Sequence, residues 1–494
     1  SKSSVRVTVP GVRIPRFPLN LGESIYFCIC TFIDTIPLFA NNTIQVKQLI
    51  IFKLITMTYS RRQFIKTAGL ATLGTVITSP SFGSTMWTSN SNTLKVGLIG
   101  CGGRGTGAAG EALNADPNVV LTAMADAFED HLNSSYNSLK EKYGNKIQVS
   151  DSNKFVGLDA YQKLIDSDVD VVLLAAPPCF RPLHLEAAVN ANKHIFCEKP
   201  FAVDAPGLRR VMEAAKKAKS KNLSLVSGFC WRYHQPKREV FGRVLDGQIG
   251  NIIGGEATYN TSELWYKERQ KGWSDMEYKL RNWLYYSWMS GDHIVEQAIH
   301  SIDMFSWAMG DKAPLKISGT GGRQKRIDPK YGNVFDHFGI TYEYADGAKI
   351  YMFCRQQEGT SPSYAVELAG QDGRCYVDCR TGDHIITGKN AWKYADETKF
   401  TDAEAYKQTK VRGMYQVEHD ELFASIRANK PMNDGEWMTR SNMLAIAGRM
   451  AAYSGQTITF DQAMNSTEML FPENMSFDTQ YDLPIAIPGI KEFK

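Results

Sequence analysis

The sequence predicts an α/β protein with a doubly wound parallel sheet, followed by an α+β domain with an antiparallel sheet. Between residues 94 and 229, short continuous apolar runs alternate with amphipathic helical stretches, as in a parallel sheet covered on both faces. A glycine-rich turn joins the first apolar run to the first helix. From residue 315 onwards, apolar and polar residues alternate in short stretches separated by glycine turns, which is typical of antiparallel strands.

The composition is that of a globular protein. The chain has 494 residues, of which 43% are hydrophobic and 22% charged, so it is long enough for two or three domains and is neither collagen-like nor a coiled coil. Its 56 basic and 52 acidic residues give a net charge of +4. Nine of the basic and two of the acidic residues lie in the first 83, which leaves 47 basic and 50 acidic residues. The globular part therefore gives no electrostatic indication of a nucleic-acid partner, and we expect none.

Residues 57–83 are similar to a twin-arginine export signal. Arg61 and Arg62 stand in the setting S-R-R-Q-F-I-K, and a short apolar run over residues 68–77 leads to small residues before position 84. A membrane-spanning helix needs about 20 apolar residues, so we expect no stable anchor after signal removal. The alternative is an amphipathic anchor helix. We expect the mature protein to be periplasmic or otherwise exported through the twin-arginine pathway.

Residues 1–56 begin with Ser and show neither a helical nor a strand period. We expect Met57 to be the true start and the preceding residues to be untranslated upstream sequence or a disordered extension. The alternative is a real extension whose apolar patch, residues 25–40, touches a membrane. Seven of the nine cysteines follow the signal without a C-x-x-C motif, so we expect neither a disulfide framework nor a zinc site.

The glycine-rich turn predicts a dinucleotide site. Residues 94–99 form an apolar strand, the turn G-C-G-G-R-G at 100–105 follows directly, and an alanine-rich helix follows over 106–114. This is G-x-G-x-x-G between a strand and a helix. The first glycine permits the tight turn, the second lets a pyrophosphate approach the backbone, and the last lets helix and strand pack closely. The predicted cofactor contacts in the turn are Gly100, Gly102, Gly103, Arg104 and Gly105.

Asp126 stands at the carboxyl end of the second predicted strand, residues 118–125. A carboxylate there accepts hydrogen bonds from both ribose hydroxyls and repels a 2′-phosphate. No Lys or Arg occurs in the next four residues, so NAD is favoured over NADP. The alternative for Asp126 is a helix cap.

The alternation of strand and helix continues to residue 229, so residues 94–229 are predicted to be a Rossmann-type domain. Ligands of such sheets bind at the carboxyl ends of the strands, where Pro178, Lys199 and Trp231 fall. The further strands are expected at residues 169–176, 194–197 and 223–229, and the further helices at residues 161–167, 182–192 and 206–220.

Four motifs occur in order: GCGGRG at 100–105, AAPP at 175–178, HLEAAVNANKHIFCEKP at 184–200 and GDHIVEQAIHSID at 291–303. With these motifs, residues 94–455 resemble the Gfo/Idh/MocA family, the relatives of glucose-fructose oxidoreductase and inositol dehydrogenase. The resemblance implies a second domain at 230–455, whose open antiparallel sheet forms one wall of the active site. The remaining residues, 456–494, carry Pro484 and Pro488 and are predicted to be a C-terminal tail.

The resemblance implies that Lys199 lies beside the nicotinamide and the substrate. The residue before a proline is held extended, so Lys199 has a fixed stem and a mobile charge suited to an alkoxide or carbonyl oxygen. Glu296 and His300 stand at i and i+4, on one face of a helix, and the implied role of this pair is acid-base transfer on a substrate hydroxyl. The family usually has Asp where this chain has Glu296, which leaves the role of that residue in doubt.

Other contacts follow from the same resemblance. The predicted cofactor contacts outside the turn are Asp126, Pro178, His184, Glu198, Lys199 and Trp231, and the predicted substrate contacts are Lys199, Arg232, Tyr286, His293 and His300. One alternative for His300 is a core histidine. Another is a metal site, because His293, Glu296 and His300 recur at i, i+3 and i+7; we rank it second and expect no metal.

The second domain opens with an aromatic-rich stretch that suits sugar rings, although packing or a subunit interface is the alternative. Its aromatic residues include Trp265, Tyr266, Trp273, Tyr278, Trp283, Tyr285, Tyr286 and Trp288. We expect an exported, homo-oligomeric NAD(P)-dependent oxidoreductase that moves hydride between a small carbohydrate (a sugar, cyclitol or glycoside) and a tightly bound cofactor. The alternatives are a redox glycoside hydrolase and an inactive sugar- or nucleotide-binding protein.

Overall fold

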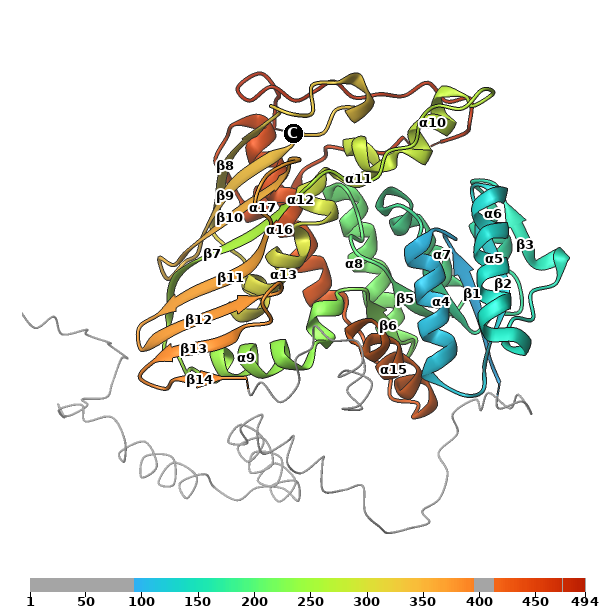
Figure 1. Cartoon of the computed structure of the whole chain (residues 1–494), viewed down its shortest axis with the longest axis horizontal. Helices are drawn as coiled ribbons and strands as arrows, with labels where there is room; N and C mark the ends of the chain where they lie inside the picture. The colour runs from blue at the N-terminus through green and yellow to red at the C-terminus, as the bar shows by residue number, and fades with distance from the viewer. Residues whose placement is uncertain (1–92, 395–412, 473, 494) are drawn as a thin grey trace, which may run out of the picture. The chain divides into compact units, whose positions relative to one another are not determined.

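The computed structural model describes residues 93–394, 413–472 and 474–493, and the predicted export signal and N-terminal extension lie outside them. The first sheet has six parallel strands in the order β3-β2-β1-β4-β5-β6 (Figure 1). Its strands are β1 (Leu94–Ile99), β2 (Val119–Asp126), β3 (Lys154–Val156), β4 (Val171–Leu174), β5 (His194–Cys197) and β6 (Leu225–Ser227). Its helices are α4 (Gly103–Ala115), α5 (Glu129–Tyr143), α6 (Ala160–Ile165), α7 (Arg181–Asn190) and α8 (Ala205–Ser220).

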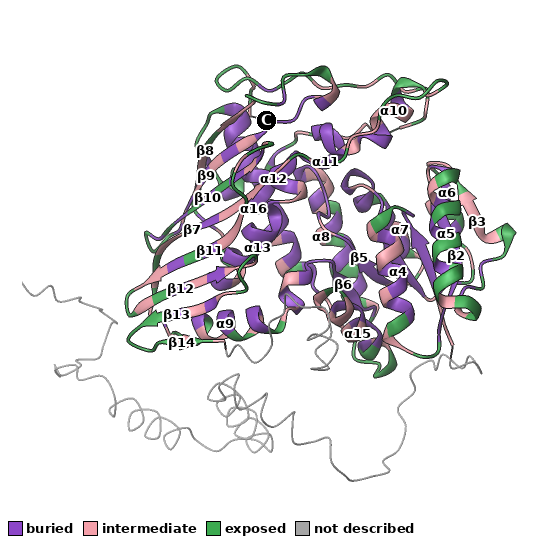
Figure 2. Cartoon of the chain, viewed as in Figure 1, coloured by how far each residue is buried: buried purple, intermediate pink, exposed green. Residues whose placement is uncertain are grey.

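The parallel sheet predicted from the apolar runs is confirmed. All four residues of β4 are buried, because helices cover both faces of the sheet. Figure 2 shows buried residues along these strands and exposed residues on the outer side of α5. The strand order reverses between β1 and β4, so the loops after these two strands diverge and leave a crevice at the carboxyl edge of the sheet.

The second sheet has nine strands in the order β14-β13-β12-β11-β7-β10-β9-β8-β15. They are β7 (Ile252–Thr261), β8 (Lys316–Gly322), β9 (His337–Glu343), β10 (Lys349–Gln356), β11 (Ser363–Gly370), β12 (Gly373–Asp378), β13 (His384–Gly388), β14 (Trp392–Lys393) and β15 (Ile458–Thr459). All neighbours are antiparallel except β7 and β10, which pair in parallel. This exception arises because the chain leaves β7 for a helical excursion and returns through β8 and β9.

Helices cover one face of this sheet. The excursion contains α10 (Asp275–Arg281), α11 (Ser287–Ser290), α12 (His293–Glu296) and α13 (Ile299–Ala308), and further helices are α9 (Gln235–Leu245), α16 (Gly435–Ser454) and α17 (Phe460–Asn465). Helix α15 (Met414–Arg427) instead packs against α4 and the first sheet. Residues of β10 alternate between buried and exposed, and Tyr351 and Phe353 are 43% and 44% exposed. The other face of the sheet is therefore open. Within the described residues no helix has the length and apolarity needed to cross a membrane.

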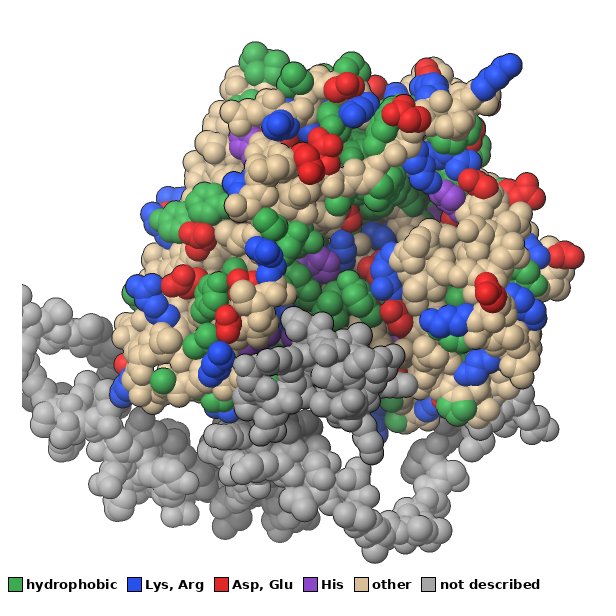
Figure 3. Space-filling view, in the orientation of Figure 1, with side chains coloured by type: hydrophobic (Ala, Val, Ile, Leu, Met, Phe, Trp, Pro, Cys, Tyr) green, Lys and Arg blue, Asp and Glu red, His purple; other side chains and the backbone are tan. Residues whose placement is uncertain are grey.

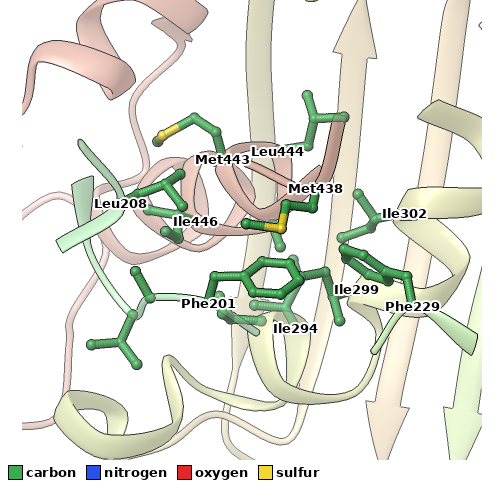
Figure 4. Packing of buried hydrophobic residues seen from close by; sticks show 14 of the residues in the cluster. Phe201, Leu208, Phe229, Ile294, Ile299, Ile302, Met438, Met443, Leu444 and Ile446 are labelled. Carbon is green, nitrogen blue, oxygen red and sulfur yellow. The ribbon is translucent and has the colours of Figure 1, made fainter. Parts of the chain in front are cut away.

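The two domains share one hydrophobic core. Phe201 and Phe229 of the first domain pack ring against ring with centroids 5.5 Å apart, and Ile294 of α12 and Met438 of α16 lie beside them (Figure 4). The amide of Asn442 fastens α16 to the first domain, because its Oδ1 accepts hydrogen bonds from the backbone of residues 201 and 202 at 2.6 and 3.1 Å. The position of the second domain over the first sheet is therefore fixed by packing.

Candidate active site

The glycine turn after β1 is shaped by two close approaches. Gly100 has φ +95°, and a Cβ there would lie 2.4 Å from the backbone nitrogen of Ala176. A Cβ on Gly105 would lie 1.8 Å from the carbonyl oxygen of Gly100. A Cβ on Gly102 or Gly103 would meet nothing within 4 Å. The turn therefore leaves open space above the N-terminus of α4, where backbone N–H groups attract a phosphate.

Asp126 is oriented by the backbone around it. Its Oδ2 accepts a hydrogen bond from the Cys101 amide at 2.6 Å, and its Oδ1 accepts one from the Phe128 amide at 2.9 Å. Helix α5 has Phe128, not Asp126, as its N-cap residue, so the helix-cap alternative is wrong. The carboxylate lines the cavity beside the turn, where it can receive the ribose hydroxyls of a dinucleotide.

The cavity over the turn has a volume of about 790 Å³, within the range of cofactor sites. His184 forms part of its wall and stacks on Tyr161 with centroids 4.3 Å apart. Burial lowers the pKa of His184 to about 3, so the ring is neutral. The open space at Gly102 and Gly103, the Asp126 carboxylate and the neutral ring of His184 together fit a nicotinamide dinucleotide. Pro178 begins the turn η3 (Pro178–Phe180), although the cavity is lined by its neighbour Pro177.

Arg104, a residue of the turn, is paired with Glu198. Arg104 Nε is 3.1 Å from Glu198 Oε1, and the guanidinium also bonds the carboxylate of Glu111 and lies 4.6 Å from the centre of the Tyr415 ring. Arg104 lines the cavity. Glu198 is 3% exposed and is not among the residues that line the cavity, so its contact with the cofactor stays a prediction. Its place is to hold Arg104 and the backbone of Lys199, whose amide lies 3.2 Å from Glu198 Oε2.

Lys199 meets Glu296 across the two domains. Its ammonium donates to the backbone carbonyl of Glu296 at 2.6 Å and to the carboxylate oxygen Oε1 at 3.2 Å. Each side chain is 13% exposed, and Glu296 Oε2 is buried without a hydrogen-bond partner. The pair stands after the carboxyl end of β5, where a ligand of the first sheet is expected. An ammonium held in this way can donate a hydrogen bond to a substrate oxygen.

His300 is a buried, neutral imidazole. The ring is packed against Trp231 with centroids 4.9 Å apart, and Nδ1 is buried without a hydrogen-bond partner. Burial lowers the pKa of His300 well below its usual value, and the positive charges of Lys199 and Lys237 lower it further. The ring is therefore able to accept a proton. Trp231, predicted as a cofactor contact, packs beside this histidine and is not part of the cofactor cavity wall.

Glu296 and His300 do not share one continuous helix as predicted. Helix α12 ends at Glu296, and α13 begins at Ile299, because Gln297 breaks the regular pattern and the amide of Ala298 bonds back to the carbonyl of His293. The break directs the Glu296 carboxylate to Lys199.

Three predicted substrate contacts are used elsewhere in the protein. Arg232 bonds Asp303 and Asp311 at 2.6 to 3.1 Å, so its guanidinium holds the second domain together. Tyr286 is 5% exposed and packs near Trp288. Both side chains are buried among other residues of the core. Trp288, from the same aromatic stretch, is itself fully buried.

His293 is also a core residue. Its Nδ1 lies 3.0 Å from Asp292 Oδ1, and its ring packs against Phe338 with centroids 5.0 Å apart. In the described part of the chain, no group of three or more His, Cys, Asp or Glu residues is arranged to hold a metal ion. The seven described cysteines carry free thiols.

Several residues of the site were not foreseen. Lys237 is 3% exposed, and its ammonium lies 3.4 Å from His234 Nδ1 and 5.1 Å from the centre of the Trp231 ring. In the sequence, Lys237 is only one lysine of the second domain's first helix, and no motif marks it as a residue of the site. Figure 3 shows basic side chains and a histidine gathered in a hollow near the centre of this face. Lys267 and Arg281 also reach from the second domain into the cofactor cavity wall, together with Trp265 and Trp283, which the sequence predicted only as part of an aromatic stretch suited to sugar rings.

A dinucleotide cavity on a parallel sheet, with the ammonium of Lys199 at the carboxyl end of β5 and a neutral imidazole presented by the second domain, is the arrangement of a nicotinamide-dependent oxidoreductase. Two family profiles match the chain: the oxidoreductase family NAD-binding Rossmann fold over residues 94–225, and the GFO/IDH/MocA C-terminal domain over residues 238–376. The chain belongs to the Gfo/Idh/MocA family of oxidoreductases, and its first domain binds NAD.

Curated relatives are similar over part of their length. Inositol 2-dehydrogenase of Salmonella paratyphi B is 28% identical over 221 residues, which are 44% of this chain and 55% of that enzyme. The chain thus spans about half the length of this relative. Myo-inositol 2-dehydrogenase of Thermotoga maritima is 28% identical over 285 residues, which are 58% of this chain and 75% of that enzyme. The solved structure of aldose-aldose oxidoreductase from Caulobacter crescentus, complexed with glycerol, has the same fold, with a TM-score of 0.58, 17% identity and coverage of 74% of this chain and 99% of that one.

Proposed function

We propose that this protein is an NAD-dependent oxidoreductase that moves hydride between a carbohydrate carbon and a retained cofactor. The observation that carries the proposal is the Lys199–Glu296 pair beside the neutral His300, at the carboxyl edge of the NAD-binding sheet. The substrate class is a sugar, cyclitol or glycoside. Relatives that are inositol dehydrogenases support this class.

The residues divide the work of oxidising a secondary alcohol. His300 accepts the hydroxyl proton, because its imidazole is neutral at physiological pH. The ammonium of Lys199 donates a hydrogen bond to the same oxygen as it becomes a carbonyl. Glu296 holds that ammonium through its backbone and carboxylate. NAD, when bound, accepts the hydride from the carbon that loses its hydrogen, so one proton and one hydride leave together.

The test is a substrate panel on the purified protein with NAD, read by NADH fluorescence. We expect NADH to form with at least one member of a panel of cyclitols and aldoses. His300→Asn should lower the rate by about a hundredfold or more, because a general base contributes that much. Lys216→Met is the matched control, since this lysine is exposed and pairs with Glu213. If the protein retains NAD but forms no NADH with any substrate of the panel, the result would instead support the inactive binding protein.

A redox glycoside hydrolase is the second candidate. The cofactor cavity is walled by both domains, which favours a cofactor that stays bound and is regenerated on the enzyme. Transient oxidation of a glycoside would permit elimination at the glycosidic bond, and the hydride would then return. Cleavage of nitrophenyl glycosides by the NAD-loaded protein, without added cofactor, would support this candidate. Absence of cleavage across a broad panel would count against it.

Export and self-association complete the proposal. The paired Arg61 and Arg62 with Phe64 and Lys66 support a twin-arginine signal, and fractionation of the natural host after Arg61→Lys/Arg62→Lys tests it. Exposed Ile253, Tyr351 and Phe353 on the neighbouring strands β7 and β10 support a homo-oligomer. Light scattering measures the mass: a monomer at micromolar concentration would refute self-association.

A further inference from the structure

A segment of the second domain forms the outer wall of the cofactor cavity. Residues 262–283 follow β7, include α10, and lie toward the α5 and α6 side of the first sheet (Figure 1). The side chains of this segment that line the cavity are Trp265, Lys267, Leu280, Arg281 and Trp283. They share the cavity with Asp126, which marks the ribose position in this fold. The segment therefore faces the adenosine half of a bound dinucleotide.

Arg281 fastens this wall to the first domain. Its Nη1 and Nη2 donate to the two carboxylate oxygens of Asp130 at 2.9 and 3.0 Å. The same guanidinium lies 3.9 Å from the centre of the Phe128 ring, one residue before α5 begins. A two-point guanidinium–carboxylate contact is among the stronger polar contacts, and this one is strengthened by the aromatic face beneath it.

Lys267 makes a second connection. Its ammonium lies 3.0 Å from His131 Nε2, and His131 Nδ1 lies 3.6 Å from Asp126 Oδ1. A chain of polar groups therefore runs from the second domain to the ribose carboxylate. The backbone amide of Lys267 is itself held by Asn282 Oδ1 at 2.9 Å, so the loop has a defined position.

The C-terminal tail braces the wall from outside. Ser274 Oγ donates to the Phe477 carbonyl at 3.0 Å, and the Lys279 ammonium donates to the Tyr481 carbonyl at 2.8 Å. The Phe477 ring lies 5.9 Å from the Phe128 ring, so the tail contacts both the wall and the first domain.

We propose that residues 262–283 complete the adenosine half of the cofactor site and retain the dinucleotide between turnovers. The proposal rests on the proposed function, because it assumes NAD in this cavity. The flat rings of Trp265 and Trp283 are suited to the adenine base. Dissociation of the dinucleotide past this wall requires the contacts of Arg281 and Lys267 with the first domain to break. One NAD molecule therefore serves both oxidation and reduction.

The experiment measures cofactor release directly. The protein is loaded with NADH and mixed with a large excess of NAD, and the decay of bound NADH fluorescence gives the dissociation rate. In Arg281→Ala and in Asp130→Ala we expect this rate to rise about tenfold, equivalent to the loss of about 1.4 kcal/mol of contact free energy. The Asp130 side chain is 62% exposed, so this variant keeps the test available if Arg281→Ala fails to fold.

Arg269→Ala is the matched control. Arg269 lies in the same segment, but its contacts are with Asp275 at 2.8 Å and the Tyr278 ring at 4.3 Å, both within the segment. The control should release NADH at the wild-type rate. Unchanged release in both Arg281→Ala and Asp130→Ala would overturn the retention proposal while leaving the oxidoreductase intact. A protein that binds no NADH at all would overturn both.

Discussion

Lys199→Met separates the chemical role of this lysine from its structural one. The substitution removes an ammonium that is bonded to Glu296 at 2.6 and 3.2 Å, with both side chains 13% exposed. It leaves a carboxylate in a largely buried position with no opposite charge, and Glu296 Oε2 already has no partner. Breaking such a pair lowers the free energy of unfolding by about 3 kcal/mol. Loss of the hydrogen bond to the substrate oxygen lowers kcat by about a hundredfold or more.

The double variant Lys199→Met/Glu296→Gln distinguishes the two effects. Removing the carboxylate charge as well should restore most of the stability lost in the single variant, as measured by urea unfolding. Activity should remain low, because no ammonium is present to polarise the substrate oxygen. Recovery of activity together with stability would show that Lys199 serves the fold only, and the mechanism derived above would be wrong.

Three further predictions concern the base, the turn and the ribose carboxylate. Lys237→Met removes a positive charge that lowers the pKa of His300, so this pKa should rise. The acidic limb of the kcat/KM profile for alcohol oxidation should therefore move to higher pH. A shift to lower pH would contradict the assignment of His300 as base. Gly105→Ala places a Cβ 1.8 Å from a backbone oxygen and should destabilise the first domain. Gly103→Ala points into open space, so it should weaken NAD binding with little change in the unfolding temperature. Equal effects of the two variants in calorimetry and in NAD titration would refute this interpretation of the turn. Asp126→Asn removes the charge that repels a 2′-phosphate, so the ratio of NAD to NADP affinity should fall by about tenfold in fluorescence titrations, and an unchanged ratio would mean that another group sets the preference.

The parallel sheet was predictable because its strands are nearly continuous apolar runs between helices. Strands β8 to β12 were predictable for a related reason, since one face is buried and the other is open. Strand β7 was not predicted: its sequence IIGGEATYNT has two glycines and no clear alternation. It lies in the middle of the nine-stranded sheet because β10 and β11 bond to it on both sides, which no local pattern reveals.

The site shows the same limit. Lys199 and His300 could be found from their motifs, and Asp126 from its place after a strand. The contact between Lys199 and Glu296 joins residues 97 positions apart, so only the folded chain shows it. Arg232 was predicted as a substrate contact, and only the folded chain shows its carboxylate partners, which are 71 and 79 residues further along the chain. Trp265 and Arg281 line the cofactor cavity only because the loop of the second domain that carries them packs against the first domain, and no local sequence pattern predicts that position.

Helix α16 has a consequence for how this protein unfolds and how it can be engineered. Nearly all of its residues are buried, and Asn442 and Arg449 bond to the backbone of the first domain while the helix packs beneath β8 and β9 of the second. Unfolding of either domain therefore removes packing partners of the other, and calorimetry should record a single cooperative transition. A chimera that exchanges the second domain between relatives must carry this helix and its partners along, because α16 is bonded to both domains.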